Sequence, residues 1–252
     1  MTTAGRGAPG PHQTTNGFFA APLRDYVLHC LGGPVSLLQA GCLAPVAELG
    51  IGELTLGGFE ISVTAVDADD PLAKQVLQGT GTAYDDVIVG DLRTVPITQR
   101  AYDVVYCAGL LERVQHVELV LDRLVSALKP GGLLLIRTMD RYSAAGLLDR
   151  LLPGPARKAL WSRLRPGVPG PFPAVYDRPV CDAGIASYTL MRGLVIAARG
   201  AELTLPDQAR ISSSVRITCA AIARVTRGRF GDSHDELLYV IRKPQDRFAR
   251  VV

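Results

Sequence analysis

The stretches YDVVYCAGLLERVQH, residues 102–116, and LKPGGLLLI, residues 128–136, decide the fold. Each holds a short, mostly apolar run, at 103–107 and 133–136, and an amphipathic helical pattern over 117–128 lies between the two runs. Strands covered on both faces are apolar throughout, and an intervening helix returns the chain to the start of a parallel neighbour. The two stretches therefore predict a strand–helix–strand unit.

Earlier in the chain the same pattern occurs three more times, after a helix predicted at about 21–31. The three apolar runs and the residues that follow them are Val35–Leu38 before Gln39-Ala40-Gly41, Ile61–Val66 before Asp67, and Val87–Val89 before Gly90-Asp91. Short apolar strands that alternate with helices are typical of a doubly wound α/β sheet. In such a sheet the ligand binds beyond the carboxyl ends of the strands, where the strand order reverses.

The C-terminal half is less regular. Seven prolines fall within 153–179, which predicts a cap or lid insertion over about 141–185. Beyond it we predict a helix over 187–199 and two antiparallel strands over 215–225 and 237–241. Residues 1–17 are predicted to form a flexible arm, and residues 18–252 a single domain that includes the cap.

The composition of the chain limits the classes of function that are possible. The chain is 48% hydrophobic and 20% charged, with a net charge of +3, so it predicts a globular protein. Its 23 arginines and four lysines are spread along the chain, which argues against a nucleic-acid partner. No apolar run is long enough to span a membrane, and we expect a cytoplasmic protein with five reduced cysteines and no metal site. A homodimer or a partner subunit remains open.

Acidic residues stand at the ends of two predicted strands. Asp67 follows the second strand, where a carboxylate accepts both hydroxyl protons of a ribose. Asp91 follows the third strand and offers an acceptor for an adenine amine, with Leu92 to pack against the ring. The pattern indicates a nucleoside-containing cofactor. The alternative is that Asp67, together with Asp69 and Asp70, caps the helix that follows.

The order of these segments resembles the class I S-adenosylmethionine-dependent methyltransferases, especially those that act on small molecules. The matching stretches are VSLLQAGC (35–42), VTAVDAD (63–69), VGDLRTVP (89–96), YDVVYCAGLLERVQH (102–116) and LKPGGLLLI (128–136). The resemblance implies a Rossmann-like sheet of seven strands with one antiparallel C-terminal strand. It also implies S-adenosylmethionine as cofactor, with contacts from Gln39, Gly41, Asp67, Ala68, Asp91, Leu92, Cys107 and Ala108.

The first motif departs from the family pattern, which reads acid-x-Gly-x-Gly-x-Gly. The same positions here hold Gln39, Gly41, Leu43 and Pro45. Gln39 carries no charge for a cationic amine, Leu43 disfavours a positive φ, and Pro45 has no N–H to donate. The loop is therefore reshaped: either it binds the cofactor in a modified way, or the fold serves another purpose.

Candidates for the chemistry lie after the fourth and fifth strands. His116 is the candidate general base for an acceptor that must lose a proton, and Arg113 the candidate partner for an acidic substrate. Each has a plain alternative as a surface residue. Asp140 and Tyr142 are candidates of second rank. The segment 155–166 is interpreted as a helix packed on the domain, with a lid or a membrane-surface element as alternatives.

We therefore expect a methyltransferase that acts on a small-molecule acceptor, in secondary metabolism. Two alternatives use the same fold without methyl transfer. One is an enzyme of another kind, such as a pericyclase, and the other is a catalytically silent partner subunit. The acids Asp67 and Asp91 favour the first reading, whereas Leu43 and Pro45 favour the alternatives.

Overall fold

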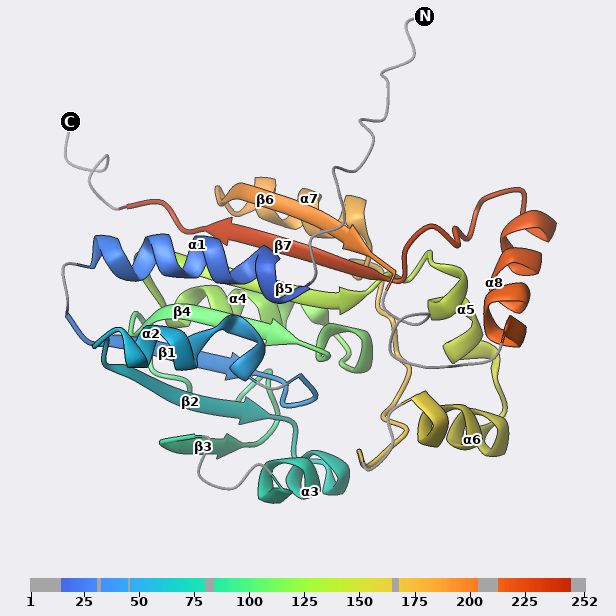
Figure 1. Cartoon of the computed structure of the whole chain (residues 1–252), viewed down its shortest axis with the longest axis horizontal. Helices are drawn as coiled ribbons and strands as arrows, with labels where there is room; N and C mark the ends of the chain where they lie inside the picture. The colour runs from blue at the N-terminus through green and yellow to red at the C-terminus, as the bar shows by residue number, and fades with distance from the viewer. Residues whose placement is uncertain are drawn as a thin grey trace, which may run out of the picture.

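A single seven-stranded sheet organises the chain. The computed structural model describes residues 15–30, 33–44, 46–79, 84–164, 168–203 and 213–245. The sheet order is β3-β2-β1-β4-β5-β7-β6, and β7 alone runs antiparallel to its neighbours (Figure 1). The strands are β1 (Val35–Ala40), β2 (Ile61–Asp67), β3 (Asp86–Val89), β4 (Tyr102–Ala108), β5 (Leu128–Met139), β6 (Val195–Glu202) and β7 (Glu236–Arg242). The predicted fold class is confirmed, and the strand order reverses between β1 and β4.

Helices cover both faces of the sheet. On one face lie α1 (Thr15–His29), η1 (Val46–Leu49), α2 (Ile51–Leu56) and α3 (Pro71–Gly79), and on the other α4 (Val117–Ala127) and α7 (Asp182–Met191) (Figure 1). The short helix η3 (Leu111–Arg113) follows β4. The chain alternates strands with helices because each apolar strand needs cover on two faces.

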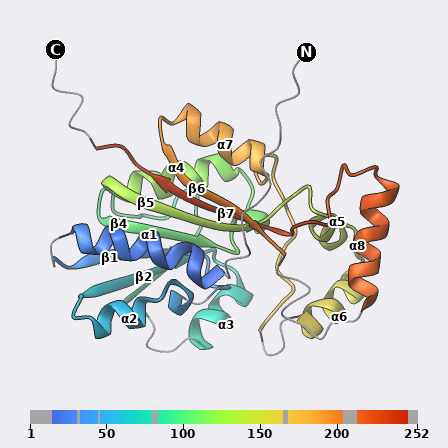
Figure 2. The same cartoon turned by 45° about the horizontal axis from the view of Figure 1, so that its top comes forward.

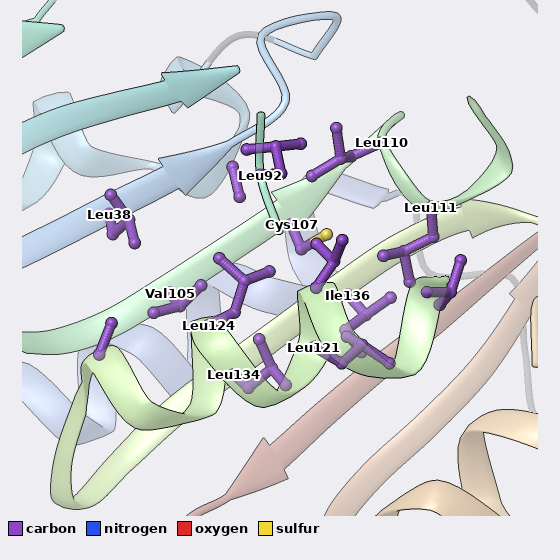
Figure 3. Packing of buried hydrophobic residues seen from close by; sticks show 14 of the residues in the cluster. Leu38, Leu92, Val105, Cys107, Leu110, Leu111, Leu121, Leu124, Leu134 and Ile136 are labelled. Atoms are coloured by element: carbon purple, nitrogen blue, oxygen red, sulfur yellow. The ribbon is translucent and has the colours of Figure 1, made fainter. Parts of the chain in front are cut away.

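The larger core lies under α4. Its side chains Leu121 and Leu124 pack with Val105 of β4 and Ile136 of β5, all at most 1% exposed (Figure 3). Burial of a leucine or isoleucine side chain stabilises the fold by about 1.5–3 kcal/mol. This packing fixes the ends of β4 and β5, and with them the loops that carry the candidate residues.

Three helices form a cap beyond the carboxyl ends of the parallel strands: α5 (Ala144–Leu151), α6 (Gly154–Leu164) and α8 (Ser213–Val225) (Figure 2). The first two fall in the stretch where the sequence predicts an insertion, whereas α8 comes from beyond β6 and contacts α5. The Ala144 N–H donates to Gly231 O at 2.7 Å and so joins the two parts of the cap. No helix in the ranges described has the length and apolarity needed to cross a bilayer.

Two predictions for the C-terminal region are wrong. The strand predicted over 215–225 is α8, in which the less exposed side chains recur at 215, 219, 222 and 226, a helical spacing that the β-branched residues obscured. The predicted antiparallel partner of β7 is therefore not this segment: β7 pairs with β5 and β6.

The helix predicted over 187–199 is also wrong. Its first part belongs to α7, the chain turns at Gly193 with φ +65°, and β6 begins at Val195. Side chains of β6 alternate between exposed and half-buried, as expected for an edge strand. The first helix likewise begins earlier than predicted, at Thr15, so residues 15–17 of the predicted arm are helical; residues 1–14 lie outside the described residues.

Candidate functional site

The turn after β1 is held by its own side chains. The buried Gln39 amide donates through Nε2 to Gly41 O at 3.2 Å and to Ala44 O at 2.7 Å. Its Oε1 is buried and has no hydrogen-bond partner among the residues that the structure describes. Gly41 has φ +82° and donates its N–H to Val66 O of β2 at 2.9 Å. One glutamine thus fixes the shape of a turn that lies beside the end of β2.

Gly41 faces the end of β4 and the residues that follow it. A Cβ atom at this position would lie 2.6 Å from Ala108 O, 2.8 Å from Leu110 Cβ and 3.2 Å from Arg113 Nη2. The positive φ and this close approach both require glycine. The space above Gly41 is therefore already filled by protein atoms.

Asp67, at the end of β2, is 1% exposed and accepts three hydrogen bonds within the protein. Its Oδ1 accepts the Ala68 N–H at 2.7 Å, and its Oδ2 accepts the Cys42 N–H at 2.9 Å. Oδ2 also accepts from Arg113 Nη2 at 2.9 Å, and both side chains of this ion pair are at most 4% exposed. The capping alternative fits Asp70 instead, since Asp70 Oδ1 accepts the Leu72 N–H near the start of α3.

Arg113 reaches Asp67 from η3. Its Nε donates to Gly109 O at 2.6 Å, and its guanidinium carbon lies 4.6 Å from the centre of the Phe172 ring. Phe172 is 3% exposed and belongs to the proline-rich segment between α6 and α7. Sequence reasoning placed Arg113 on a substrate or at the surface; in the structure it is buried and paired inside the protein.

These contacts test whether the residues fit the nucleoside of S-adenosylmethionine. A carboxylate offers about four acceptor positions, and three of those of Asp67 are used. Leu110 and Arg113 also lie over Gly41. In this conformation the residues do not fit a ribose on Asp67, because a diol needs two acceptor positions and the buried carboxylate has about one left.

The other predicted contact residues surround this point. Asp91 is exposed and paired with Arg93 at 2.7 Å, and hydrogen bonds from Arg93 hold the pKa of its carboxyl at about 2. Leu92 is 4% exposed and belongs to the core cluster that also holds Leu110 (Figure 3). Burial raises the pKa of the Cys107 thiol, which is enclosed in the same cluster.

Ala68 packs against that cluster from the end of β2, and Ala108 is buried on the opposite face of the sheet. The predicted contact residues thus lie at or just beyond the ends of β1, β2, β3 and β4. Their role as cofactor contacts stays a prediction.

His116, the candidate base from the sequence, is exposed at the N-terminus of α4. It has φ +55°, and its carbonyl accepts the N–H groups of Leu119 and Val120. Tyr142 is exposed and its ring packs with Phe230. The structure thus gives His116 a place in the backbone of a helix start, and its catalytic role stays a prediction.

A second histidine escaped the sequence reasoning. His234, just before β7, lies with its Nε2 2.9 Å from Asp140 Oδ2 and its Nδ1 3.2 Å from Ser233 Oγ. Asp140 is 5% exposed, and its hydrogen bond raises the pKa of His234. The pair spans 94 positions of sequence, so only the pairing of β5 with β7 brings it together.

The sequence analysis also did not single out a buried arginine. Arg137, near the end of β5, donates to Glu236 Oε2 at 2.6 Å and to Glu48 Oε2 at 2.5 Å. The sequence signal was a charged residue directly after the apolar run LLLI. Because two carboxylates hold it, Arg137 ties η1 and β7 to β5 at the same end of the sheet as Asp140.

Comparisons with known proteins relate part of this chain to methyltransferases. Residues 46–136 match the family described as Methyltransferase domain. Two curated relatives, each a ubiquinone biosynthesis O-methyltransferase from a strain of Rickettsia bellii, are 33% identical over 119 residues, which are 45% of this chain and 46% of the relative. The match thus spans about half the length of these relatives.

Solved structures share the fold. A putative sarcosine dimethylglycine methyltransferase from Galdieria sulphuraria has a TM-score of 0.56 at 16% identity, over 91% of this chain and 85% of that one. The plantazolicin methyltransferase BpumL, in complex with a pentazolic desmethylPZN analog and SAH, has a TM-score of 0.54 at 14% identity, over 92% and 83%.

Proposed function

We propose that this chain methylates a small-molecule acceptor with S-adenosylmethionine as donor; the match of residues 46–136 to the methyltransferase family, the partial match to O-methyltransferases and the shared fold support the proposal. The observation that carries the proposal is the placement of Asp67. It ends β2 beside the glycine turn of β1, at the point where the strand order reverses. This is where an open α/β sheet binds its ligand.

We propose further that the acceptor is a hydroxyl group. The curated relatives are O-methyltransferases by name and share 33% identity with this chain over the matched residues. A hydroxyl acceptor has to lose its proton when its oxygen is methylated, so such a reaction calls for a base. The acceptor would lie over the ends of β4 and β5, beneath the cap.

His234 is the base that we propose. When its Nε2–H donates to Asp140, its Nδ1 is the acceptor nitrogen, which the Ser233 hydroxyl meets at 3.2 Å. A substrate hydroxyl that replaced Ser233 would pass its proton to Nδ1, and Asp140 would stabilise the imidazolium. β7 lies two strands from β4, a spacing of about 10 Å, so one acceptor molecule can reach from β4 to His234.

Calorimetric titration with S-adenosylmethionine and with S-adenosylhomocysteine tests the proposed function. We expect saturable binding to the unmodified protein and its loss in Asp67→Asn. Asp103→Asn is the matched control, because Asp103 also accepts a backbone N–H and a cation but lies at the opposite end of the sheet. Loss of binding in both variants would contradict the role of Asp67, and so would unchanged binding in both variants.

The Asp67–Arg113 pair favours a second candidate, a protein of this fold that transfers no methyl group. Permanent occupation of Asp67 by Arg113 would leave no place for a ribose. Such a protein would be a pericyclase-like enzyme or a silent partner subunit. This second candidate predicts no heat of binding and no thermal shift at millimolar S-adenosylmethionine, whereas a methyltransferase predicts saturable binding.

A further inference from the structure

The Asp67–Arg113 pair is connected directly to the proline-rich segment 168–180. Glu112, next to Arg113 in η3, accepts the N–H groups of both Val175 and Tyr176 through its backbone carbonyl, each at 2.9 Å. The Phe172 ring lies on the Arg113 guanidinium. Two main-chain bonds and one ring contact thus fasten this segment to the helix that carries Arg113.

The same segment reaches α6. The rings of Phe172 and Trp161 lie 5.8 Å apart, and the Trp161 indole N–H donates to Val168 O at 3.0 Å. Trp161 is the single tryptophan of the chain. A continuous line of contacts therefore runs from Asp67 through Arg113 and Phe172 to Trp161 in the cap.

We propose that Arg113 is an internal competitor for the cofactor ribose, and that its departure from Asp67 frees the part of the proline-rich segment around Phe172. The proposal rests on the proposed function. Because Asp67 accepts three hydrogen bonds and is almost completely buried, a diol cannot bind to it in this conformation. The ribose can hydrogen-bond to the carboxylate only when Arg113 moves away. Withdrawal removes the cation from the face of Phe172, and so nucleoside binding and movement of the segment become one event.

The competition predicts that weakening the internal contact strengthens cofactor binding. A protein whose open state is a small fraction of the population binds with an affinity reduced by that fraction. We therefore expect Arg113→Gln to bind S-adenosylhomocysteine at least tenfold more tightly than the unmodified protein. Phe172→Ala, which keeps the ion pair but removes the ring, is expected to tighten binding by a smaller factor, about threefold to tenfold.

Calorimetry with S-adenosylhomocysteine measures these affinities, and circular dichroism verifies that each variant is folded. Arg192→Gln is the matched control, since Arg192 also pairs with a carboxylate, that of Asp122, but lies on the surface away from Asp67. Its affinity should equal that of the unmodified protein. If Arg113→Gln does not fold, Phe172→Ala and Arg113→Lys, whose compact ammonium lacks the planar fork, supply the same comparison.

Trp161 fluorescence measures the second half of the proposal. S-adenosylhomocysteine should change the emission of the unmodified protein, and this change should be reduced in Phe172→Ala although binding persists. Weaker binding in Arg113→Gln, with Arg192→Gln unchanged, would make Arg113 a cofactor ligand and overturn the competition. Binding without any change of emission would overturn the coupling. Failure of every variant to bind would instead reject the proposed function itself, and the competition with it.

Discussion

Removing either partner of the Asp67–Arg113 pair should destabilise the protein, and removing both should cost less than the sum. At the observed 2.9 Å, and with an effective dielectric constant of about 20, the attraction is about 6 kcal/mol before desolvation is subtracted. Breaking a buried pair by removal of one partner costs about 3–5 kcal/mol, because the other charge stays buried. We expect about this loss for Asp67→Asn.

Arg113→Met should cost about 2–4 kcal/mol, because Asp67 keeps its two backbone N–H donors when the guanidinium is removed. The double variant leaves no unpaired buried charge. Its loss should therefore fall short of the sum of the single losses by about 2 kcal/mol or more.

Urea denaturation followed by circular dichroism gives the four free energies of unfolding that this cycle needs. Asp122→Asn with Arg192→Gln provides a parallel cycle on an exposed pair, where we expect a coupling energy of about 0.2–1 kcal/mol. Additive losses at Asp67 and Arg113, within about 0.5 kcal/mol, would refute the reasoning, since they would mean that the two side chains do not meet in solution.

Three further predictions concern other parts of the molecule. In a proton NMR titration His234 should have a pKa above the ordinary 6.5, and Asp140→Asn should lower it; the stability from this pair is full below about pH 6.5 and is lost as pH rises through the folded-state pKa. An unshifted His234 resonance would contradict this. Gly41→Ala should cost about 2–4 kcal/mol in urea denaturation, owing to φ +82° and the backbone contact, whereas Gly52→Ala, in open space on a helix, should be neutral or stabilising. Cys107 should resist thiol labelling at pH 8 until the protein unfolds, because burial raises its pKa; rapid labelling of the native protein would disprove its enclosure.

The centre of the sheet could be predicted because each of its strands contains a mostly apolar run. The runs at 35–38, 61–66 and 103–107 all lie within strands that extend them by one or two residues. Prediction failed where a pattern was ambiguous over a short distance. In α8 valine and isoleucine suggested a strand, and contact with α5 rather than local preference made the segment helical.

The site could be placed but not described from the sequence. Position along the strands brought Asp67 and Gly41 to one edge, since parallel strands end together. The contact of Arg113 with Asp67 joins residues 46 positions apart, and that of His234 with Asp140 joins residues 94 apart. Neither leaves a periodic signal, because each depends on how a loop folds back after its strand.

The amide of Gln39 determines the order in which residues must be replaced when the turn after β1 is redesigned. Replacement of Leu43 and Pro45 by glycine would restore the sequence of a glycine-rich motif. Gln39 Nε2 would nevertheless still donate hydrogen bonds to the carbonyls of Gly41 and Ala44. An acidic residue at position 39 would release both carbonyls, because a carboxylate has no N–H to donate. Redesign of this turn should therefore begin at position 39. Glycines at positions 43 and 45 can change the shape of the turn only after the two hydrogen bonds from Gln39 are removed.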